Sequence, residues 1–407
     1  MKLLYLVSFF PFPPHSGGAL RVSNIIQQLA PRHQVHVLAL DYLAPAERQA
    51  AYRQAAQYCA SVLPIPHQQS KPHALWRQLR HGLPYELAYT YNPAMQRAAR
   101  TAIARIQPDV VLCSRLAGAQ FLPPQTTAVT VLDQHDLSRY LWQTFIEGNP
   151  SPWIRMYARI NQLYVKAAEQ RIYRNFDLVI SVSEAEREMT AAFAPPRNQL
   201  LAAPNGVDVD YFRPDPSVAP EPFSLVLTGE MQQRRNVDAA LFLCQQILPL
   251  VRERYPQVRC FIVGRKPTPE VQSLAALPGV TVTGAVPDVR PYLAAATVAV
   301  APYRFGSGVK HKIPIALAMG KPLVATTNAI QGIALEDRRH GLIADDAAGL
   351  ADAICTLFGD AALCQQLSRN ARQLAVERYS WVGIVQQIEQ AILGIAGPAQ
   401  PIRKGNV

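Results

Sequence analysis

Residues 297–327 form the segment that most restricts how this chain can fold. An apolar run at 297–302 leads into a glycine-spaced loop. A helical pattern at 309–319 stops at Gly320, and a second apolar run covers 322–326. Strand, loop, helix and strand in this order predict a βαβ unit, whose loop sits at the N-terminus of the helix.

The loop of this unit is suited to an anion. Unpaired backbone N–H groups and the positive end of the helix dipole lie at a helix N-terminus. Positive charge is added there by Arg304, Lys310, His311 and Lys312, and Gly306 gives the backbone of the loop more conformational freedom. We therefore expect a phosphate-bearing ligand. The alternative is an ordinary βα turn with solvated basic side chains.

The same alternation of strands and helices runs through two halves of the chain. The opening has an apolar strand at 2–8, a loop rich in Pro and Gly at 11–18, a helix that ends near Pro31 and a strand at 35–40. This is the start of a doubly wound sheet. Gly17 and Gly18 precede the helix, where they either admit a ligand close to the backbone or only make the turn.

A chain of 407 residues is too long for one core, and a proline-rich run at 214–222 has the composition of a linker. We expect an N-terminal Rossmann-like domain at 1–206 and a C-terminal Rossmann-like domain at 207–379. A helix at 380–396 would cross back to the first domain, and 397–407 would be a tail. The fold class is α/β, with two doubly wound domains that face each other across a ligand cleft.

Composition limits the compartment and the partners. The six cysteines show no Cys-x-x-Cys spacing, which favours thiols in a reducing, cytoplasmic compartment over a disulfide or zinc framework. The formal net charge is +11, and residues 1–206 carry 20 Lys and Arg against 12 Asp and Glu. No nucleic-acid module is recognisable. An anionic membrane surface is the favoured partner for this charge.

Three further segments of the first half attract attention. The helix expected at 151–175 has a basic face with aromatic residues, so it either lies on a membrane or presents a solvated face. Residues 63–93 are rich in Pro, His and aromatic residues, which predicts an irregular insertion or lid. His135 and Asp136 follow a strand at its carboxyl end, where they either bind substrate and act as acid and base or play a structural part.

Several stretches spread over nearly the whole sequence resemble the retaining glycosyltransferases of family four, which have the GT-B fold. The resemblance rests on FPFPPHSGGALRVSNIIQQLAPRHQVHVLAL, FDLVISVSEAERE and PNGVDVDYFRP in the first half, and on LTGEMQQRRNVDAALFLCQQILPLVRERYP, FIVGRKPTP, VTVTGAVPDVRPYLAAATVAVAPYRFGSGVK and LAMGKPLVATTNAIQGI in the second. In the second half, the motif TG-x-M is followed by NVDA. This combination is similar to the one in sugar transferases of exopolysaccharide and exosortase-associated loci.

The resemblance implies a retaining, metal-independent transfer from a nucleotide-sugar to a glycan or lipid-linked acceptor, in cell-surface or exopolysaccharide assembly. The donor would be a co-substrate, with no further cofactor and no nucleic acid. The acceptor would sit on the first domain, with His135 and Asp136 as the catalytic candidates. The implied donor-binding residues are Gly17, Gly18, Arg235, Asn236, Val286, Arg304, Gly306, Ser307, Gly308, Val309, Lys310 and Ile315. The enzyme would be cytoplasmic, with peripheral contact to the inner membrane face.

The chain also departs from the family pattern. Two glutamates eight positions apart are typical of the family, and Ser307 and Ile315 stand at those positions here. Ile315 cannot accept hydrogen bonds from ribose hydroxyls, which should cost on the order of 1.5–3 kcal/mol of donor binding. Glu230 stands where the family has an arginine. These departures leave open a non-catalytic scaffold of a glycan-assembly complex, and a nucleotide-sugar epimerase is a further alternative.

Overall fold

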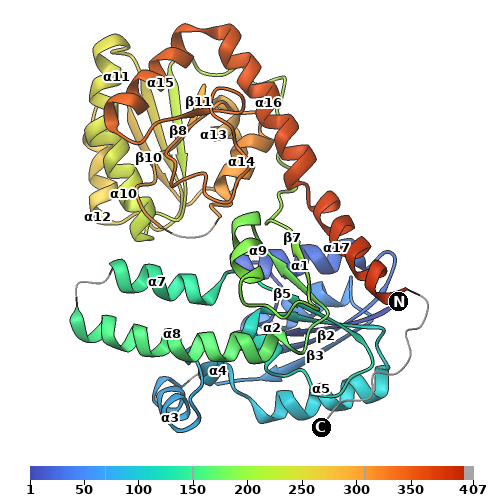
Figure 1. Cartoon of the computed structure of the whole chain (residues 1–407). Helices are drawn as coiled ribbons and strands as arrows, with labels where there is room; N and C mark the ends of the chain where they lie inside the picture. The colour runs from blue at the N-terminus through green and yellow to red at the C-terminus, as the bar shows by residue number, and fades with distance from the viewer. Residues whose placement is uncertain (69, 149–150, 307–308, 398–407) are drawn as a thin grey trace. The chain divides into compact units, whose positions relative to one another are not determined.

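The computed structural model describes the chain except for residues 69, 149–150, 307–308 and 398–407. The chain divides into two compact units. The first unit is Met1–Pro204 together with the segment from Ile384 onward, and the second is Asn205–Gly383. Figure 1 shows the elements of both units in the order of the chain.

The first unit is built on a seven-stranded parallel sheet in the order β3-β2-β1-β4-β5-β6-β7. Its strands are β1 (Lys2–Val7), β2 (Gln34–Asp41), β3 (Ser61–Pro66), β4 (Val110–Ser114), β5 (Val129–Asp133), β6 (Leu178–Ser181) and β7 (Gln199–Ala202). Its helices are α1 (Gly17–Leu29), α2 (Pro45–Ala56), α3 (Lys71–His81), α4 (Tyr85–Thr90), α5 (Pro93–Ile106), α6 (Arg115–Ala119), α7 (Ser138–Gly148), α8 (Pro152–Tyr173) and α9 (Glu184–Ala191).

Both faces of this sheet are covered, which explains the continuous apolar run of β1. Leu3, Tyr5 and Val7 join one buried cluster, which also contains residues of α1 and of α17 (Trp381–Ala396). Leu4 and Leu6 point the other way, into a second cluster with residues of α5, α6 and α8. Successive side chains of a strand alternate between faces, so a strand that is apolar throughout needs a layer on each side.

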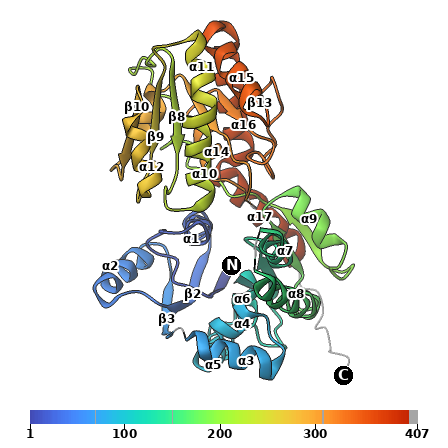
Figure 2. The same cartoon turned by 90° about the vertical axis from the view of Figure 1, so that its left-hand side faces the viewer.

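The second unit has a six-stranded parallel sheet in the order β10-β9-β8-β11-β12-β13. The strands are β8 (Ser224–Thr228), β9 (Arg259–Val263), β10 (Val280–Gly284), β11 (Val298–Ala301), β12 (Leu323–Ala325) and β13 (Leu342–Ile343). Its helices are α10 (Arg234–Phe242), a π-helical turn (Leu243–Ile247), α11 (Leu248–Arg254), α12 (Pro269–Ser273), a 3₁₀ turn (Leu274–Ala276), α13 (Arg290–Ala295), α14 (Lys312–Ala318), α15 (Ala347–Gly359) and α16 (Ala361–Tyr379). Figure 2 shows β10, β9 and β8 side by side.

Short polar side chains fix where several helices begin. Ser16 accepts a hydrogen bond from the backbone N–H of Ala19 and so caps α1. Ser183 caps α9 in the same way, through the N–H of Glu186. Each cap satisfies a backbone donor that the helix itself leaves unpaired. The cap of α1 places Gly17 and Gly18 in its first turn.

The prediction of an irregular insertion at 63–93 is wrong. This segment completes β3 and forms α3 and α4. Its prolines suggested a loop, but Pro64 and Pro66 lie in β3, the edge strand of the sheet. An edge strand has no neighbour on its outer side, so a proline there removes no hydrogen bond of the sheet. The sequence patterns also passed over the edge strand β7 and the helix α7.

The βαβ unit of the second half is present, with a shorter helix than predicted. β11 and β12 pair in parallel, and α14 begins at Lys312 instead of residue 309. Further along the same unit, a π-helical turn separates α10 from α11. The predicted tail at 397–407 lies outside the described residues except for Gly397.

Candidate active site

The predicted donor residues of the second unit gather at the carboxyl ends of two neighbouring strands. β8 leads through a loop into α10, whose first turn carries Arg235 and Asn236. The segment between β11 and α14 carries Gly306, Val309 and Lys310. β8 and β11 are adjacent and parallel, so their loops emerge at the same edge of the sheet.

Lys310 is a buried cation at this edge. Its Nζ donates hydrogen bonds to the backbone oxygens of Gly306 (2.8 Å) and Asn328 (2.6 Å). Burial, assisted by the charge of Arg235, lowers the pKa of Lys310 to about 8. The side chain is therefore held in place by neutral acceptors, which leave its positive charge without a counter-charge.

Lys312 lies beside it, on the first turn of α14. Its Nζ donates to Asn236 Oδ1 at 2.6 Å and lies 3.3 Å from the Tyr303 hydroxyl. Burial and Arg235 lower the pKa of Lys312 to about 7 against the opposing effect of Glu230. Within the described part of the chain, neither Lys310 nor Lys312 forms an ion pair with a carboxylate.

Two glycines shape the surroundings of these cations. A Cβ at Gly306, where φ is 112°, would lie 3.2 Å from Cδ of Arg235, so the loop packs directly on this side chain. A Cβ at Gly229 would lie 2.7 Å from Nζ of Lys312. Gly229 is not among the predicted site residues, although a glycine straight after the strand β8 is a signal of close approach. Arg235, Lys310 and Lys312 together are called the cation cluster below.

The other predicted donor residues differ in their surroundings. Arg304 forms a two-point ion pair with Asp238, with distances of 3.0 and 2.5 Å, so its charge is already offset. Val286, Val309 and Ile315 are half-buried and pack against the apolar core of the second unit. Ser307 and Gly308 lie outside the described residues.

Glu230, the acidic departure from the family pattern, has partners of its own. Its carboxylate accepts hydrogen bonds from the side chains of Gln232 and Gln233 at 2.9 Å each, and lies 3.2 Å from Arg265. Its backbone oxygen accepts from Asn236 Nδ2 at 2.8 Å. Glu230 therefore holds the loop before α10 in shape, which positions Asn236 under Lys312.

In the first unit, the structure brings His135 and Gly18 together. A Cβ at Gly18 would lie 3.1 Å from Nδ1 of His135, whereas one at Gly17 would meet nothing within 4 Å. His135 follows β5 and is buried. Its Nδ1 has no hydrogen-bond partner within the described residues.

The acidic partner of His135 is Asp133, the last residue of β5. Asp133 Oδ2 lies 3.1 Å from His135 Nε2, while Oδ1 receives Arg21 Nε at 2.8 Å and the Tyr5 hydroxyl donates to Oδ2 at 2.9 Å. Burial would raise the pKa of Asp133, but Arg21 and His135 outweigh it and hold the pKa well below its usual range. Burial also lowers the pKa of His135.

These partners define the state of the histidine ring. An ionised Asp133 accepts a hydrogen bond, so Nε2 of a neutral His135 carries the proton and Nδ1 keeps a lone pair. That lone pair is directed at the first turn of α1, beside Gly18. Asp136, the predicted partner, is half-exposed, and its Oδ2 lies 3.9 Å from Arg115 Nη2. The sequence analysis missed Arg21, whose place in a helix pattern gave no sign of its buried role.

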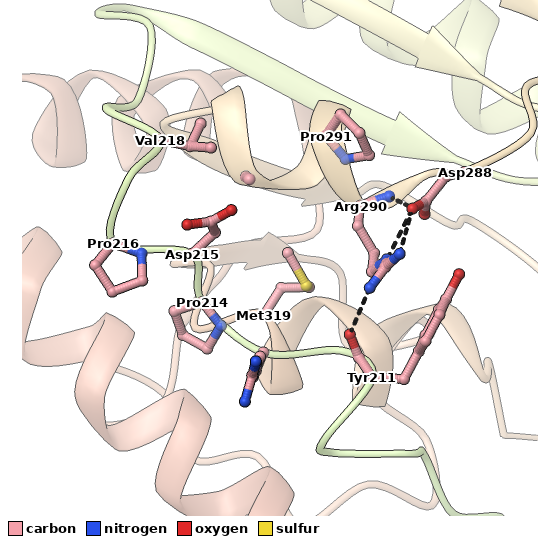
Figure 3. Close-up of a pocket in the computed structure, with 11 residues that line it drawn as sticks. Tyr211, Pro214, Asp215, Pro216, Val218, Asp288, Arg290, Pro291 and Met319 are labelled. Atoms are coloured by element: carbon pink, nitrogen blue, oxygen red, sulfur yellow. Dashed lines mark hydrogen bonds and ion pairs between the residues drawn. The ribbon is translucent and has the colours of Figure 1, made fainter.

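The second unit also contains a cavity of about 610 Å³, shown in Figure 3. Residues 211–218 and α13 line much of it. Arg290 stacks over the ring of Tyr211 at 3.8 Å and pairs with Asp288 at 2.7 Å, so its charge is offset. None of the predicted donor residues lines this cavity.

Within the described residues, no group of three or more His, Cys, Asp or Glu side chains is arranged to hold a metal ion. In the same part of the chain, no single helix has the length and apolarity of a membrane span. One bent pair, α15 with α16, meets that criterion by length and composition alone.

Comparison with protein families decides the class of the chain. Residues 15–211 match the model described as Glycosyltransferase Family 4. Residues 222–360 match the model described as Glycosyl transferases group 1. The chain is a glycosyltransferase. The family resemblance of the sequence is thus confirmed at this level.

Solved structures show that this glycosyltransferase has the GT-B fold. Sucrose-phosphate synthase from Thermosynechococcus elongatus is 19% identical, with a TM-score of 0.66 over 97% of this chain and 98% of its own. Anabaena HepE in complex with UDP is 18% identical, with a TM-score of 0.68 over 97% and 100%. A glycosyltransferase from Rickettsia africae is 14% identical, with a TM-score of 0.67 over 98% and 99%. Comparison with curated protein sequences gives no match.

Proposed function

We propose that this glycosyltransferase takes a sugar from a nucleotide-sugar whose diphosphate binds the cation cluster. The observation that carries the proposal is the uncompensated charge of Lys310 and Lys312, which are tied only to neutral acceptors. A buried cation without a counter-ion is costly, and a diphosphate supplies the missing charge. Arg235 adds a planar fork of donors suited to phosphate oxygens.

The same cluster suits the chemistry of transfer. When the glycosidic bond to the donor breaks, negative charge develops on the leaving diphosphate. Fixed positive groups at that position stabilise the transition state more than the ground state, and they need no reorganisation. Basic side chains can thus offset the leaving-group charge, and we propose a metal-independent reaction that keeps the configuration of the anomeric carbon.

In this proposal, His135 binds a hydroxyl of the acceptor. Its Nδ1 lone pair, oriented by the Asp133 contact at Nε2, accepts a hydrogen bond. Gly18 leaves the space beside this nitrogen open, since a Cβ there would approach Nδ1 to 3.1 Å. The acceptor class that we propose is a glycan or a lipid-linked sugar of the cell surface. Asp136 lies in the same loop as His135.

Uridine diphosphate sugars are the first donors to test. HepE, which shares the fold, has been crystallised with UDP and with UDP-glucose. The test is calorimetric titration with UDP-, GDP- and ADP-sugars, followed by NMR of the products to read the anomeric configuration. We expect one base to be selected and the anomer retained. Failure of every nucleotide to bind would overturn the proposal, and an inverted product would overturn the retaining mechanism.

Ile315 provides a sharper test of the donor position. If this side chain faces the ribose, Ile315→Glu restores a charged acceptor, and donor affinity should rise by roughly tenfold. Ile315→Met, which keeps the apolar character, is the matched control and should leave the affinity unchanged. Equal affinities for both variants would show that residue 315 does not face the ribose.

A non-catalytic scaffold is the second candidate, and Ile315 is the observation that favours it. An apolar side chain at this position weakens donor binding relative to a carboxylate. An enzyme depends on the donor, whereas a scaffold of a glycan-assembly complex does not need one and so tolerates this loss. Release of free nucleotide from a nucleotide-sugar, with or without an acceptor, separates the two, and absence of release with every glycan acceptor would favour the scaffold.

A further inference from the structure

The helix α8 carries two apolar stripes, and only one of them is buried. Ala158, Asn161, Val165 and Ala168 are buried within the first unit. Nearly opposite them on the helix lie side chains spaced by three and four residues, with Trp153 74% and Leu163 67% exposed. Met156 and Ile160 complete this second stripe and are also exposed.

The neighbouring helix α3 exposes apolar side chains as well. Leu75, Trp76 and Leu79 are exposed on it, with Leu79 at 78%. A buried side chain, Gln78, ties α3 to α8. Its Nε2 donates to Asn161 Oδ1 at 2.6 Å, and its Oε1 accepts from the Tyr157 hydroxyl at 2.9 Å. These hydrogen bonds tie the two helices together, and Figure 1 shows α3 below α8.

Positive charge borders these apolar side chains. On α8, Arg155, Arg159 and Lys166 follow one another along one side of the stripe. The one acidic residue of α8, Glu169, is fully buried and pairs with Arg139 at 2.9 Å. The helix α3 contains Lys71, Arg77 and Arg80 and no acidic residue. The exposed apolar and basic side chains of α3 and α8 are called the α3–α8 face below.

We propose that the α3–α8 face docks on the surface of an anionic lipid bilayer. Tryptophan and aliphatic side chains enter the boundary between headgroups and acyl chains, while Arg and Lys meet the lipid phosphates. A second copy of this chain fits less well, because it would bring the same positive charges together. This docking is independent of the donor site, and it would bring the transferase to a lipid-linked acceptor.

The test is flotation of the full chain with vesicles of phosphatidylcholine alone or mixed with phosphatidylglycerol. We expect binding to the mixed vesicles, a blue shift of tryptophan emission and release by salt. Trp153→Gln/Leu163→Gln should reduce the bound fraction at least tenfold. Arg155→Glu/Arg159→Glu should reduce it on the order of a hundredfold, because each positive charge contributes close to the membrane surface.

Matched controls separate this face from general effects. Arg97→Glu/Arg105→Glu makes the same charge change on exposed positions of α5. Leu250→Gln/Val376→Gln makes the same polarity change on exposed positions of the second unit. Both controls should bind within twofold of the parent chain. Absence of binding to mixed vesicles, equal losses in variants and controls, or a homodimer that Trp153→Gln/Leu163→Gln dissociates would each overturn the proposal.

Discussion

At the scale of single residues, pairing decides which charges are available. The chain has 40 Lys and Arg, yet two arginines near the proposed donor site already pair with carboxylates. Arg304 pairs with Asp238, and Arg265 pairs with Glu230. Lys310 and Lys312 differ because their hydrogen bonds go to neutral oxygens. The sequence could not reveal this difference, since it depends on which carboxylates the fold brings within reach.

Donor binding should depend on pH through these two lysines. Their pKa values are lowered to about 8 for Lys310 and about 7 for Lys312, and a diphosphate binds the protonated forms. Binding therefore raises both pKa values, so protons are taken up and affinity falls as the pH rises from 7 to 9, by up to about tenfold per unit for each titrating lysine.

The measurement is calorimetric titration of UDP-glucose in buffers of different ionisation enthalpy. UDP-glucose is chosen because its diphosphate diester does not titrate in this interval. Lys312→Met should remove the component that begins near pH 7. Affinity that stays constant from pH 6.5 to 9 would contradict the assignment.

The buried pair of Arg21 and Asp133 should be important for folding of the first unit. Arg21→Met leaves a fully buried carboxylate without its cation and should lower the free energy of unfolding by about 3–5 kcal/mol. The depressed pKa of Asp133 stabilises the fold above the unfolded pKa of about 4, and this stabilisation is lost as the pH falls through the folded value.

Urea unfolding at pH 7 measures this effect. Arg32→Met is the control, since Arg32 is 48% exposed in its pair with Glu389 and should change the free energy of unfolding far less, because solvent screens the pair. Equal losses for both variants would refute a special role for the buried pair.

At the scale of elements, the strands and helices of the regular βα units could be predicted, whereas the edge strands of the first sheet could not. β1, β4, β9 and the βαβ unit follow from apolar runs bounded by turn residues. The edge strand β3 contains prolines that imitate a loop, and β7 is too short for a pattern to show. The partner of His135 was missed for another reason: the adjacent Asp136 looked equally suitable in the sequence.

The turn after β9 should couple packing to the donor site. A Cβ at Gly264 would lie 1.5 Å from the backbone oxygen of Gly229, so Gly264→Ala must displace the loop that borders Lys312. We expect a loss of stability of about 1–3 kcal/mol together with weaker donor binding. Gly383→Ala, where a Cβ meets nothing within 4 Å, is the control and should lower neither property. Thermal melts and donor titration measure both, and unaltered donor binding in Gly264→Ala would refute the coupling.

At the scale of the whole molecule, charge is distributed differently in the two halves. The first half holds most of the positive excess, and the α3–α8 face accounts for a part of it at the surface. The second half is nearly balanced in number, but Lys310 is buried and Lys312 half-buried, and neither pairs with a carboxylate within the described residues. Net charge therefore indicates the proposed membrane contact, whereas the proposed donor site emerges only from the folded arrangement.

The affinity of UDP-glucose for Lys312→Met, compared with the parent chain, tests the central claim most directly. Lys266→Met, an exposed lysine of the same unit, is the control. Loss of a charged hydrogen bond to phosphate should weaken binding about 10- to 100-fold in Lys312→Met and leave Lys266→Met unchanged, with both variants folded by thermal melting. Equal affinity of Lys312→Met and the parent chain would contradict the cation cluster as the site of the donor diphosphate.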